Sequence, residues 1–318
     1  MKTLHLLKAP IKKMNSLPPV KTVKNWFADW RLYVLLLPAM VYLFVFCYMP
    51  MYGVQIAFKD FRTSLGIWAS PWVGLKHFER FVTFPNFWRI VGNTARLGAY
   101  SLATFPCSVI LALLINELTN LKFKKTVQMI TYMPYFLSTV VVCSMIILFL
   151  HKDTGFINTV IGMFGGQRTA FITVPEYFPH VYVWSGVWQG IGWGTIIYLA
   201  SLSGVSPELI EAARVDGAHR LHIIRHINLP HLVPTLTILL ILSCGGILSA
   251  DFSKVLLLSN PLNISRSQII ETYVYEIGLR NSQFSYASAI GLFNTVVNVS
   301  LLLLVNFISR RISDVSLW

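Results

Sequence analysis

The chain has 318 residues, of which 55% are hydrophobic and only 12% are charged, against about 25% charged residues in a typical soluble domain. Its mean hydropathy is +0.61. A typical soluble enzyme does not fit these values, and an apolar chain with only four cysteines is neither disordered nor a disulfide scaffold. A multi-spanning membrane protein is the class that remains.

The charge balance is strongly basic, with 26 Lys and Arg against 13 Asp and Glu. In a soluble protein this excess would suggest a nucleic-acid partner. In a membrane protein, cationic residues gather beside the cytoplasmic ends of the spans without any polyanionic ligand. We therefore expect a lipid bilayer as the environment and no nucleic acid as a partner.

The predicted organisation has three parts. Residues 1–31 hold seven Lys or Arg against one Asp and form a basic cytoplasmic tail; the first apolar run begins at Leu32, too late for a cleavable signal. Residues 32–309 form a transmembrane domain, and residues 310–318 form a cytoplasmic C-terminal tail.

A membrane-spanning helix needs about 20 apolar residues. Six stretches without Asp, Glu, Lys or Arg reach that length, and each is apolar on all sides, as lipid-facing helices are. They are Leu32–Phe58, Leu97–Asn116, Thr126–His151, Tyr177–Pro207, His226–Ala250 and Asn281–Ser309. The sequence thus predicts an all-α integral membrane protein with six transmembrane helices.

The distribution of cations predicts the orientation. With both termini inside, 15 of the 26 Lys and Arg lie on the cytoplasmic side. The short loop at Lys122–Lys125 is the best discriminator, because short loops follow the positive-inside rule most closely. Of the 11 external cations, six belong to the segment Lys59–Arg96, which is also rich in Trp and Phe. Its aromatic rings are interpreted as interfacial anchors, with a docking surface for an external partner as the alternative.

The loop at residues 206–230, between the fourth and fifth spans, is too polar to enter the bilayer. Ser206 is a suitable N-cap, Pro207 suits the first helical position, and Gly217 favours a left-handed C-terminal turn. A helix from Pro207 to Asp216 would be only about 15 Å long. A second short helix is expected from Ala218 to Asn228, before Pro230 begins the next span. The loop is therefore expected to be a stiff helix–turn–helix projection that suits a cleft on another protein.

The same loop resembles a known motif. Permease subunits of ATP-binding-cassette importers carry a cytoplasmic EAA loop, written EAA, three residues, G, nine residues, I, one residue, LP. This sequence matches it throughout. The residues assigned by this resemblance to ATPase coupling are Glu211, Ala212, Ala213, Asp216, Gly217, Ile227, Leu229 and Pro230.

The resemblance extends to the carbohydrate-importing branch, which often carries a segment like Val73–Phe78 followed by Phe87-Trp88 and Asn93-Thr94 ahead of the second span. It implies a permease of the type I importer fold in the bacterial inner membrane. It also implies a second permease subunit, two ATPase subunits and an external solute-binding protein as partners. No phosphate-binding loop occurs in this chain, so no cofactor is expected on it; ATP and Mg would bind to the partner ATPases, and the chain itself would not be an enzyme.

Candidates for the substrate path lie in the fourth and sixth windows. Aromatic rings beside an amide commonly hold sugars, because the apolar ring faces stack and the hydroxyls form hydrogen bonds. Interface anchoring is the alternative for the tryptophans. Polar side chains within a span are expected to face a helix or a cavity. These candidates are Trp184, Trp188, Gln189, Trp193, Asn294 and Asn298.

Two further patterns favour packing or no site at all. Gly186, Gly190 and Gly194 form a stripe that predicts close helix packing, with a pore role as the alternative. His222 and His226 are spaced for a metal, but no third ligand accompanies them and the neighbouring cations oppose one, so no metal site is expected.

The expected function is ATP-driven import of an oligosaccharide or polysaccharide. The external cations hint at acidic oligouronides, such as alginate or pectin fragments. A permease for a non-sugar solute is the nearest alternative. An integral membrane transferase or a proton-coupled transporter is disfavoured, because the six windows contain no carboxylate.

Overall fold

The computed structural model describes residues 30–312, and the chain divides into two units, Met1–Val54 and Gln55–Trp318. The described residues of the first unit include an apolar helical run of α1 (Trp30–Leu43), a π-helical turn (Phe44–Tyr48) and α2 (Met49–Met51). None of their side chains is buried, as expected for a helix solvated by lipid.

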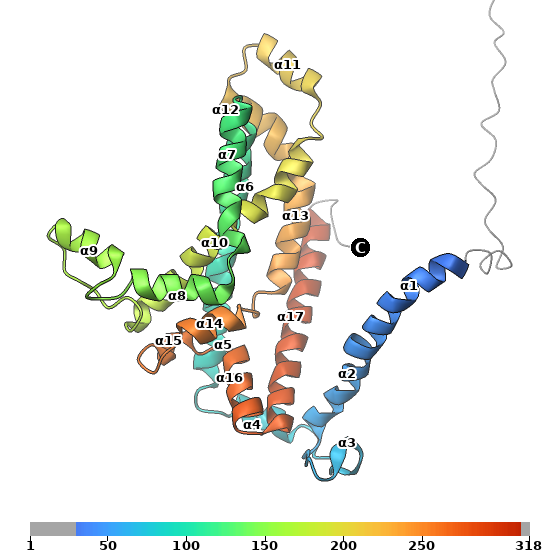
Figure 1. Ribbon diagram of the computed structural model, residues 1–318. Helices are drawn as coiled ribbons and strands as arrows, with labels where there is room; N and C mark the ends of the chain where they lie inside the picture. Colours follow the sequence, from blue (N-terminus) through green and yellow to red (C-terminus); the bar gives the residue numbers. More distant parts are fainter. Residues whose placement is uncertain (1–29, 313–318) are drawn as a thin grey trace, which may run out of the picture. The chain divides into compact units, whose positions relative to one another are not determined.

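The regular secondary structure of the second unit's described residues is helical, apart from an isolated antiparallel bridge between Lys59 and Trp72. Figure 1 shows its helices in order. They are α3 (Gly66–Ala69), α4 (Lys76–Val82), α5 (Phe87–Ala103), α6 (Pro106–Asn116), α7 (Leu121–Tyr132), α8 (Thr139–Phe149), α9 (Phe156–Met163), α10 (Phe178–Leu202), α11 (Pro207–Val215), α12 (Arg220–Ile223), α13 (Leu229–Gly245), α14 (Phe252–Leu258), α15 (Ile264–Ser267), α16 (Ile270–Tyr275) and α17 (Phe284–Ile312).

Four helical runs of the described chain are long and apolar enough to cross a membrane by themselves: Trp30–Phe58, Phe87–Asn116, Arg220–Gly245 and Phe284–Arg311. Two bent pairs bring the total to six if each pair counts as one span. The bend of 80° separates α10 from α11, and therefore lies between a span and the projecting loop. The structure thus supports four to six spans, and the predicted number of six is reached only if each bent pair is counted as one.

The second span begins at Phe87, ten residues before the predicted window. Arg96 set the start of that window at Leu97, but Arg96 and the earlier Arg89 are both exposed on α5, whereas its opposite face is buried. Asn93 and Thr94 therefore lie inside the span rather than ahead of it. Asn93 Nδ2 donates to the carbonyls of Ser265 and Gln268 (2.9 and 3.1 Å), and Thr94 Oγ1 accepts from the backbone N–H of Ile270 (3.0 Å). The two residues thus join α5 to the start of α16.

The third predicted span is broken by a bend of 99° between Phe136 and Thr139. Pro134 lies in a short 3-10 turn, and Leu137 and Ser138 are extended. The Ser138 hydroxyl then accepts from the backbone N–H of Val141 (3.4 Å) and caps α8. A missing proline N–H followed by a serine N-cap explains why the apolar run forms two helices instead of one.

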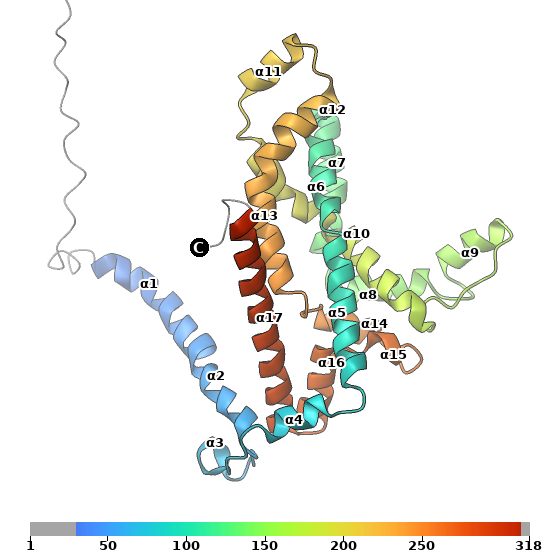
Figure 2. The same ribbon diagram turned by 180° about the vertical axis from the view of Figure 1, so that it is seen from behind.

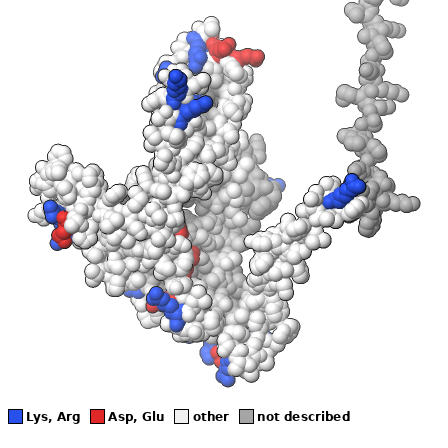
Figure 3. Space-filling model, viewed as in Figure 1, with Lys and Arg blue, Asp and Glu red and all other residues white. Residues whose placement is uncertain are grey.

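Three hydrophobic clusters hold the second unit together. One joins α5, α8, α10 and α14, a second joins α4, α5, α16 and α17, and a third joins α6, α10 and α13. Within this unit α11 lies at one end and α4 at the other, and Figure 2 shows the same separation from behind. Charged side chains gather over the end that carries α11 and α12, while the surface between the two ends is mostly uncharged, with small charged groups over the α9 region and in the lower middle (Figure 3).

Candidate functional site

The first part of the projecting loop has the predicted helix and C-terminal turn. α11 spans Pro207–Val215, and Gly217 has a φ of +79°. The backbone N–H of Ala218 donates to the Ala213 carbonyl (2.9 Å), and that of Gly217 donates to the Arg214 carbonyl (3.1 Å). This pair of bonds is a Schellman motif, which needs a left-handed residue at the position of Gly217. Ser206, predicted as the cap, makes no side-chain capping bond.

The second part of the loop differs from the prediction. The helix that begins at Arg220 runs without a break into α13 and ends at Gly245. A π-helical turn at Ile224–Asn228 carries it past Pro230, with the Leu229 N–H donating to the Ile224 carbonyl. Pro230 therefore does not begin a new helix, because the widened turn accommodates its missing N–H. The fifth span is thus continuous with the loop.

The eight residues of the EAA pattern occupy this loop. Their exposure follows their place in it. Glu211, Ala212, Asp216, Gly217, Leu229 and Pro230 are exposed, whereas Ala213 and Ile227 are half-buried. Two contacts fix the base of the loop: the ring of His231 lies 3.0 Å from the Ser201 carbonyl, and Asn228 Nδ2 donates to Glu117 Oε1 (3.4 Å).

A cavity of about 1150 Å³ lies within the second unit. Its wall is formed by α5, α6, α10 and α13, the start of α8, the connection after α13 and α14. Pockets for small ligands are commonly about 300–1,000 Å³, so this volume is sufficient for more than one sugar unit. Because α10 leads into α11 and α13 continues from α12, both ends of the projecting loop are attached to walls of the cavity.

The four candidates on α10 fall into two groups. Gln189 and Trp193 line the cavity, whereas Trp184 and Trp188 lie outside its wall. Gln189 Nε2 donates to the Leu137 carbonyl (3.1 Å), and the Trp193 ring stacks on Tyr135 with centroids 4.4 Å apart. Trp184 is 53% exposed. The structure therefore brings an amide and a stacked aromatic pair together at the cavity.

The two asparagines of α17 make hydrogen bonds to neighbouring segments. Asn298 accepts from the Leu248 backbone N–H (3.1 Å) and donates to Ser249 Oγ (3.0 Å), which holds the connection that lines the cavity. Asn294 Nδ2 donates to Glu271 Oε1 (3.2 Å), beside a second hollow of about 550 Å³. The expectation that both face a helix or a cavity is met, and neither lines the larger cavity.

The glycine stripe is not the closest contact of α10. A Cβ at Gly190 would meet nothing within 4 Å, and one at Gly194 would lie 2.6 Å from Ser108 Oγ. The tight contact is at Gly192, outside the stripe, where a Cβ would overlap the backbone of Thr131. Close packing of the stripe is therefore present at Gly194, against α6, and the closest approach of α10 is at Gly192, against α7.

Sequence reasoning missed most of the cavity lining, including its charged residues Asp251 and Lys254 and the adjacent Tyr182. Asp251 Oδ1 accepts from the Lys254 backbone N–H (3.1 Å) and caps α14, while the Tyr182 hydroxyl accepts from the Asp251 N–H (2.8 Å). Lys254 was counted among the external cations but is only 3% exposed. Burial lowers the pKa of Lys254 to about 8, so its amine still carries a proton at pH 7. The sequence signal that could have indicated this burial is the position of Lys254 next to the apolar run Val255–Leu258.

The aromatic residues of the external segment also separate into two groups. Phe81 and Phe87 are buried in the cluster that joins α4, α5, α16 and α17. Trp68, Trp72 and Trp88 are instead 63–80% exposed. The phenylalanines are thus core residues, and only the tryptophans remain as candidates for anchoring or docking.

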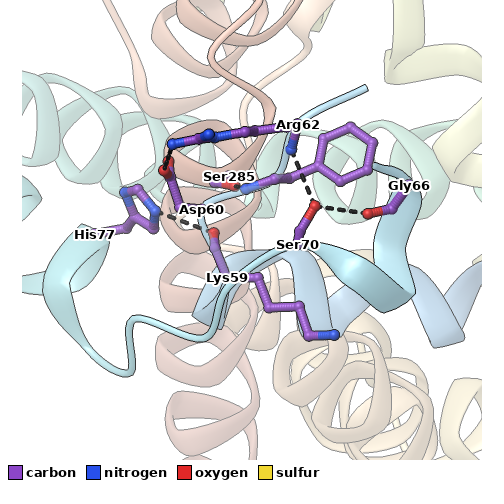
Figure 4. Close-up of polar contacts among 8 residues, drawn as sticks. Lys59, Asp60, Arg62, Gly66, Ser70, His77 and Ser285 are labelled. Atoms are coloured by element: carbon purple, nitrogen blue, oxygen red, sulfur yellow. Dashed lines mark hydrogen bonds and ion pairs between the residues drawn. The ribbon is translucent and has the colours of Figure 1, made fainter. Parts of the chain in front are cut away.

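Polar contacts order the first part of this segment (Figure 4). Ser285 Oγ accepts from the Phe61 backbone N–H (2.9 Å) and so ties the segment to α17. Ser70 Oγ donates to the Gly66 carbonyl (2.6 Å) and accepts from the Arg62 N–H (3.1 Å). The ring Nε2 of His77 lies 3.2 Å from the Lys59 carbonyl. Within the described residues, no group of three His, Cys, Asp or Glu side chains is placed to hold a metal.

His77 makes the order of this segment sensitive to pH. Burial is the largest cause that lowers the pKa of His77 below its ordinary value of 6.5, and Lys76 and Arg80 act in the same direction against Asp60 and the Lys59 carbonyl. The folded segment therefore favours the neutral ring, and its stability falls as pH drops below about 6.5. We expect hydrogen-exchange protection of residues 58–74, corrected for intrinsic exchange, to decrease between pH 7.5 and 5.5. A His77→Gln chain that shows the same decrease would contradict this assignment.

The family model for binding-protein-dependent transport system inner membrane components matches residues 104–314. This range is about two thirds of the chain and contains the projecting loop and most of the cavity wall. The chain belongs to this family. The predicted family is confirmed, and the chain is a transport subunit rather than an enzyme.

Curated relatives cover nearly all of this permease. It is 43% identical over 284 residues to the polygalacturonan/rhamnogalacturonan transport system permease protein YteP of Bacillus subtilis (strain 168), across 89% of this chain and 88% of that protein. It is 40% identical over 299 residues to Protein LplB of the same organism, across 92% and 94% of the two chains.

Solved structures of similar chains confirm the fold of this permease. One is a chain of a bacterial alginate ABC transporter in complex with an alginate pentasaccharide-bound periplasmic protein. It has a TM-score of 0.85 and 37% identity, and the match covers 92% of this chain and 99% of that one. Another, from a bacterial ABC transporter involved in the import of the acidic polysaccharide alginate, has a TM-score of 0.84 and 38% identity, across 91% and 98%. The all-helical fold of a type I importer permease is therefore confirmed.

Proposed function

We propose that this permease imports fragments of acidic polysaccharides across the bacterial inner membrane, driven by ATP hydrolysis on separate subunits. The observation that carries the proposal is the attachment of one exposed, charged loop to two walls of one large cavity. A displacement of α11 would move α10 and α13 together, which is what alternating access around a central site requires.

The loop at residues 206–230 would dock on an ATPase subunit. Ala212 and Ala213 allow close approach, and the charges of Glu211 and Asp216 would fix orientation more than they add affinity. ATP and Mg²⁺ would bind to that partner, and this chain would bind no cofactor. A second permease subunit, two ATPase subunits and an extracytoplasmic solute-binding protein would complete the importer, with both termini of this chain in the cytoplasm.

The substrate class is inferred from two kinds of support. The relative from Bacillus subtilis is named for polygalacturonan and rhamnogalacturonan, and the similar solved structures belong to importers of alginate. All three names refer to acidic polysaccharides. The cavity volume of about 1150 Å³ also suits an oligosaccharide better than an amino acid or phosphate.

The source of energy is tested by uptake in cells that produce the complete importer. Labelled trigalacturonate uptake should stop when ATP is depleted and should continue when a protonophore collapses the proton gradient while ATP is maintained. The opposite pattern would favour a proton-coupled transporter and would contradict the proposed coupling role of the loop.

The position of the substrate path is tested by a matched pair of tryptophans on α10. Trp193 lines the cavity and Trp184 does not, and both are close to half-exposed. Because stacking on an aromatic ring is worth about 0.5–1.5 kcal/mol, Trp193→Ala should reduce the kcat/KM of uptake about two- to tenfold. Trp184→Ala should leave uptake within about twofold at equal membrane levels. Equal losses for the two variants would exclude the assigned path.

A further inference from the structure

The side chain of Lys254 is an unpaired cation inside the molecule. It is 3% exposed, and its Nζ has no hydrogen-bond partner among the described residues. The nearest ring is that of Tyr182, whose centroid lies 5.6 Å from Nζ. The acid one turn before it, Asp251, uses Oδ1 to cap the helix. Asp251 and Cys143 are near enough to act on the charge of the ammonium group, but among the described residues none forms an ion pair or a hydrogen bond with it.

Such an arrangement is unfavourable unless something else compensates it. Removing a charged group from water costs several kcal/mol even after the protein relaxes. A contact with one tyrosine ring offsets only part of this cost. A methionine or leucine at this position would fill similar space without the penalty. An unpaired buried charge is therefore a poor structural device, and an anion entering from the cavity would compensate it.

Groups that can bind a sugar lie on α10 next to Lys254. Nζ lies 3.5 Å from the point where a Cβ on Gly186 would be, so the absence of a side chain there leaves the amine beside the wall formed by α10. Tyr182, Gly186, Gln189 and Trp193 follow at intervals of four, three and four residues, and all four line the cavity. This spacing places them on one helix face. Along this face, the Lys254 ammonium from α14 lies beside Gly186. The amide of Gln189 and the Trp193 ring, stacked on Tyr135, follow it.

We propose that the Lys254 ammonium binds a carboxylate of an acidic sugar unit in the cavity, and that it makes the permease selective for charged over neutral oligosaccharides. This rests on the proposed function in oligosaccharide import. The carboxylate would meet the cation beside Gly186, while the hydroxyls and the apolar ring face would meet Gln189 and Trp193 further along α10.

The test compares Lys254→Met with the native chain in the complete importer, using trigalacturonate and its fully methyl-esterified, uncharged form. Since hydrogen bonds to charged groups contribute about 1.5–3 kcal/mol, the variant should lose about ten- to a hundredfold in kcat/KM for the acid. Its uptake of the ester should stay within about twofold of the native value. Lys254→Arg should retain most uptake of the acid, and Lys152→Met, on an exposed lysine, should change neither.

The outcomes separate this inference from its alternatives. Equal loss of both substrates, with a lower Tm of the purified complex, would show that Lys254 has a structural role and would overturn the proposal. Unchanged uptake of the acid would overturn it as well. A native importer that takes up neither oligomer would contradict the proposed function. If Lys254→Met is at least as thermostable as the native complex and loses only the acid, the binding role is supported, because removing an unpaired buried charge does not destabilise a fold.

Discussion

Gly217→Pro is expected to abolish sugar-stimulated ATP hydrolysis and uptake while leaving membrane insertion intact. Gly217 has a φ of +79°, whereas proline is confined to about −65°. The Schellman turn that ends α11 therefore cannot form, and the loop loses its fixed shape. Shifting a two-state equilibrium from 1:99 to 99:1 takes about 5.5 kcal/mol, and a loosened loop cannot transmit it from an ATPase to the cavity walls.

Gly165→Pro is the matched control. Gly165 has a φ of +77°, and a Cβ there, as at Gly217, would meet nothing within 4 Å. Its N–H donates to the Gly162 carbonyl at 3.1 Å, the same distance as the corresponding bond of Gly217. Each substitution thus disrupts a glycine turn of the same kind. Gly165, however, lies after α9, away from the loop at residues 206–230. Reconstituted complexes should keep stimulated hydrolysis with Gly165→Pro. Loss in both variants would mean general damage to the fold.

Glu211→Lys probes the same loop without changing the backbone. Glu211 is exposed on α11, and most exposed substitutions change stability by less than about 0.5 kcal/mol. A reversed charge would oppose docking on a partner whose cleft matches the native charge. Stimulated hydrolysis should fall toward the basal rate at normal protein levels. Normal stimulation in this variant would contradict the assignment of Glu211 to coupling.

Gly98→Ala is expected to be the most destabilising single methyl addition in the described part of the second unit. A Cβ at Gly98 would overlap the backbone carbonyl of Ile247, which a rotamer change cannot move. Overpacking a well-packed site costs about 1–3 kcal/mol, and sometimes more. α5 would have to separate from the connection after α13, so the cavity wall would open at the same place. The Tm of the purified complex and its yield in detergent measure this loss.

Gly92→Ala, in the same helix, is the control for that prediction. A Cβ at Gly92 would meet nothing within 4 Å, and alanine favours a helix interior over glycine by about 0.5–1 kcal/mol. The two substitutions add the same methyl group to α5, and their effects on Tm should have opposite signs. Equal changes in Tm would show that the close approach at Ile247 does not limit the packing.

Features that depend on residues close together along the chain could be predicted from the sequence. Runs of about 20 uncharged, apolar residues identify the spans because a bilayer admits little else. The turn at Gly217 and the start of α11 at Pro207 were predicted within one residue, because helix ends depend on a few adjacent residues. The order and spacing of residues 211–230 were also sufficient for the family, which the match over residues 104–314 then confirmed.

The boundaries of the spans were predicted less well where a single charged residue was taken as the end of a helix. Arg96 set the start of a predicted window although α5 already begins at Phe87, since a charge on one face of a helix does not stop it. The bend of 99° before α8 depends on Pro134 and Ser138 acting together with their neighbours. Neither outcome follows from counting charges along the chain.

Only the tertiary structure decided which side chains meet. The sequence predicted Lys254 to be one of the external cations. The packing of α14 against α5, α8 and α10 instead buries it beside the cavity. The closest approach of α10 is at Gly192, outside the predicted glycine stripe. Asn93 donates to the carbonyls of Ser265 and Gln268, more than 170 residues away in sequence. Such pairings depend on how separate helices approach one another, and a linear pattern carries no record of distance between residues that are far apart along the chain.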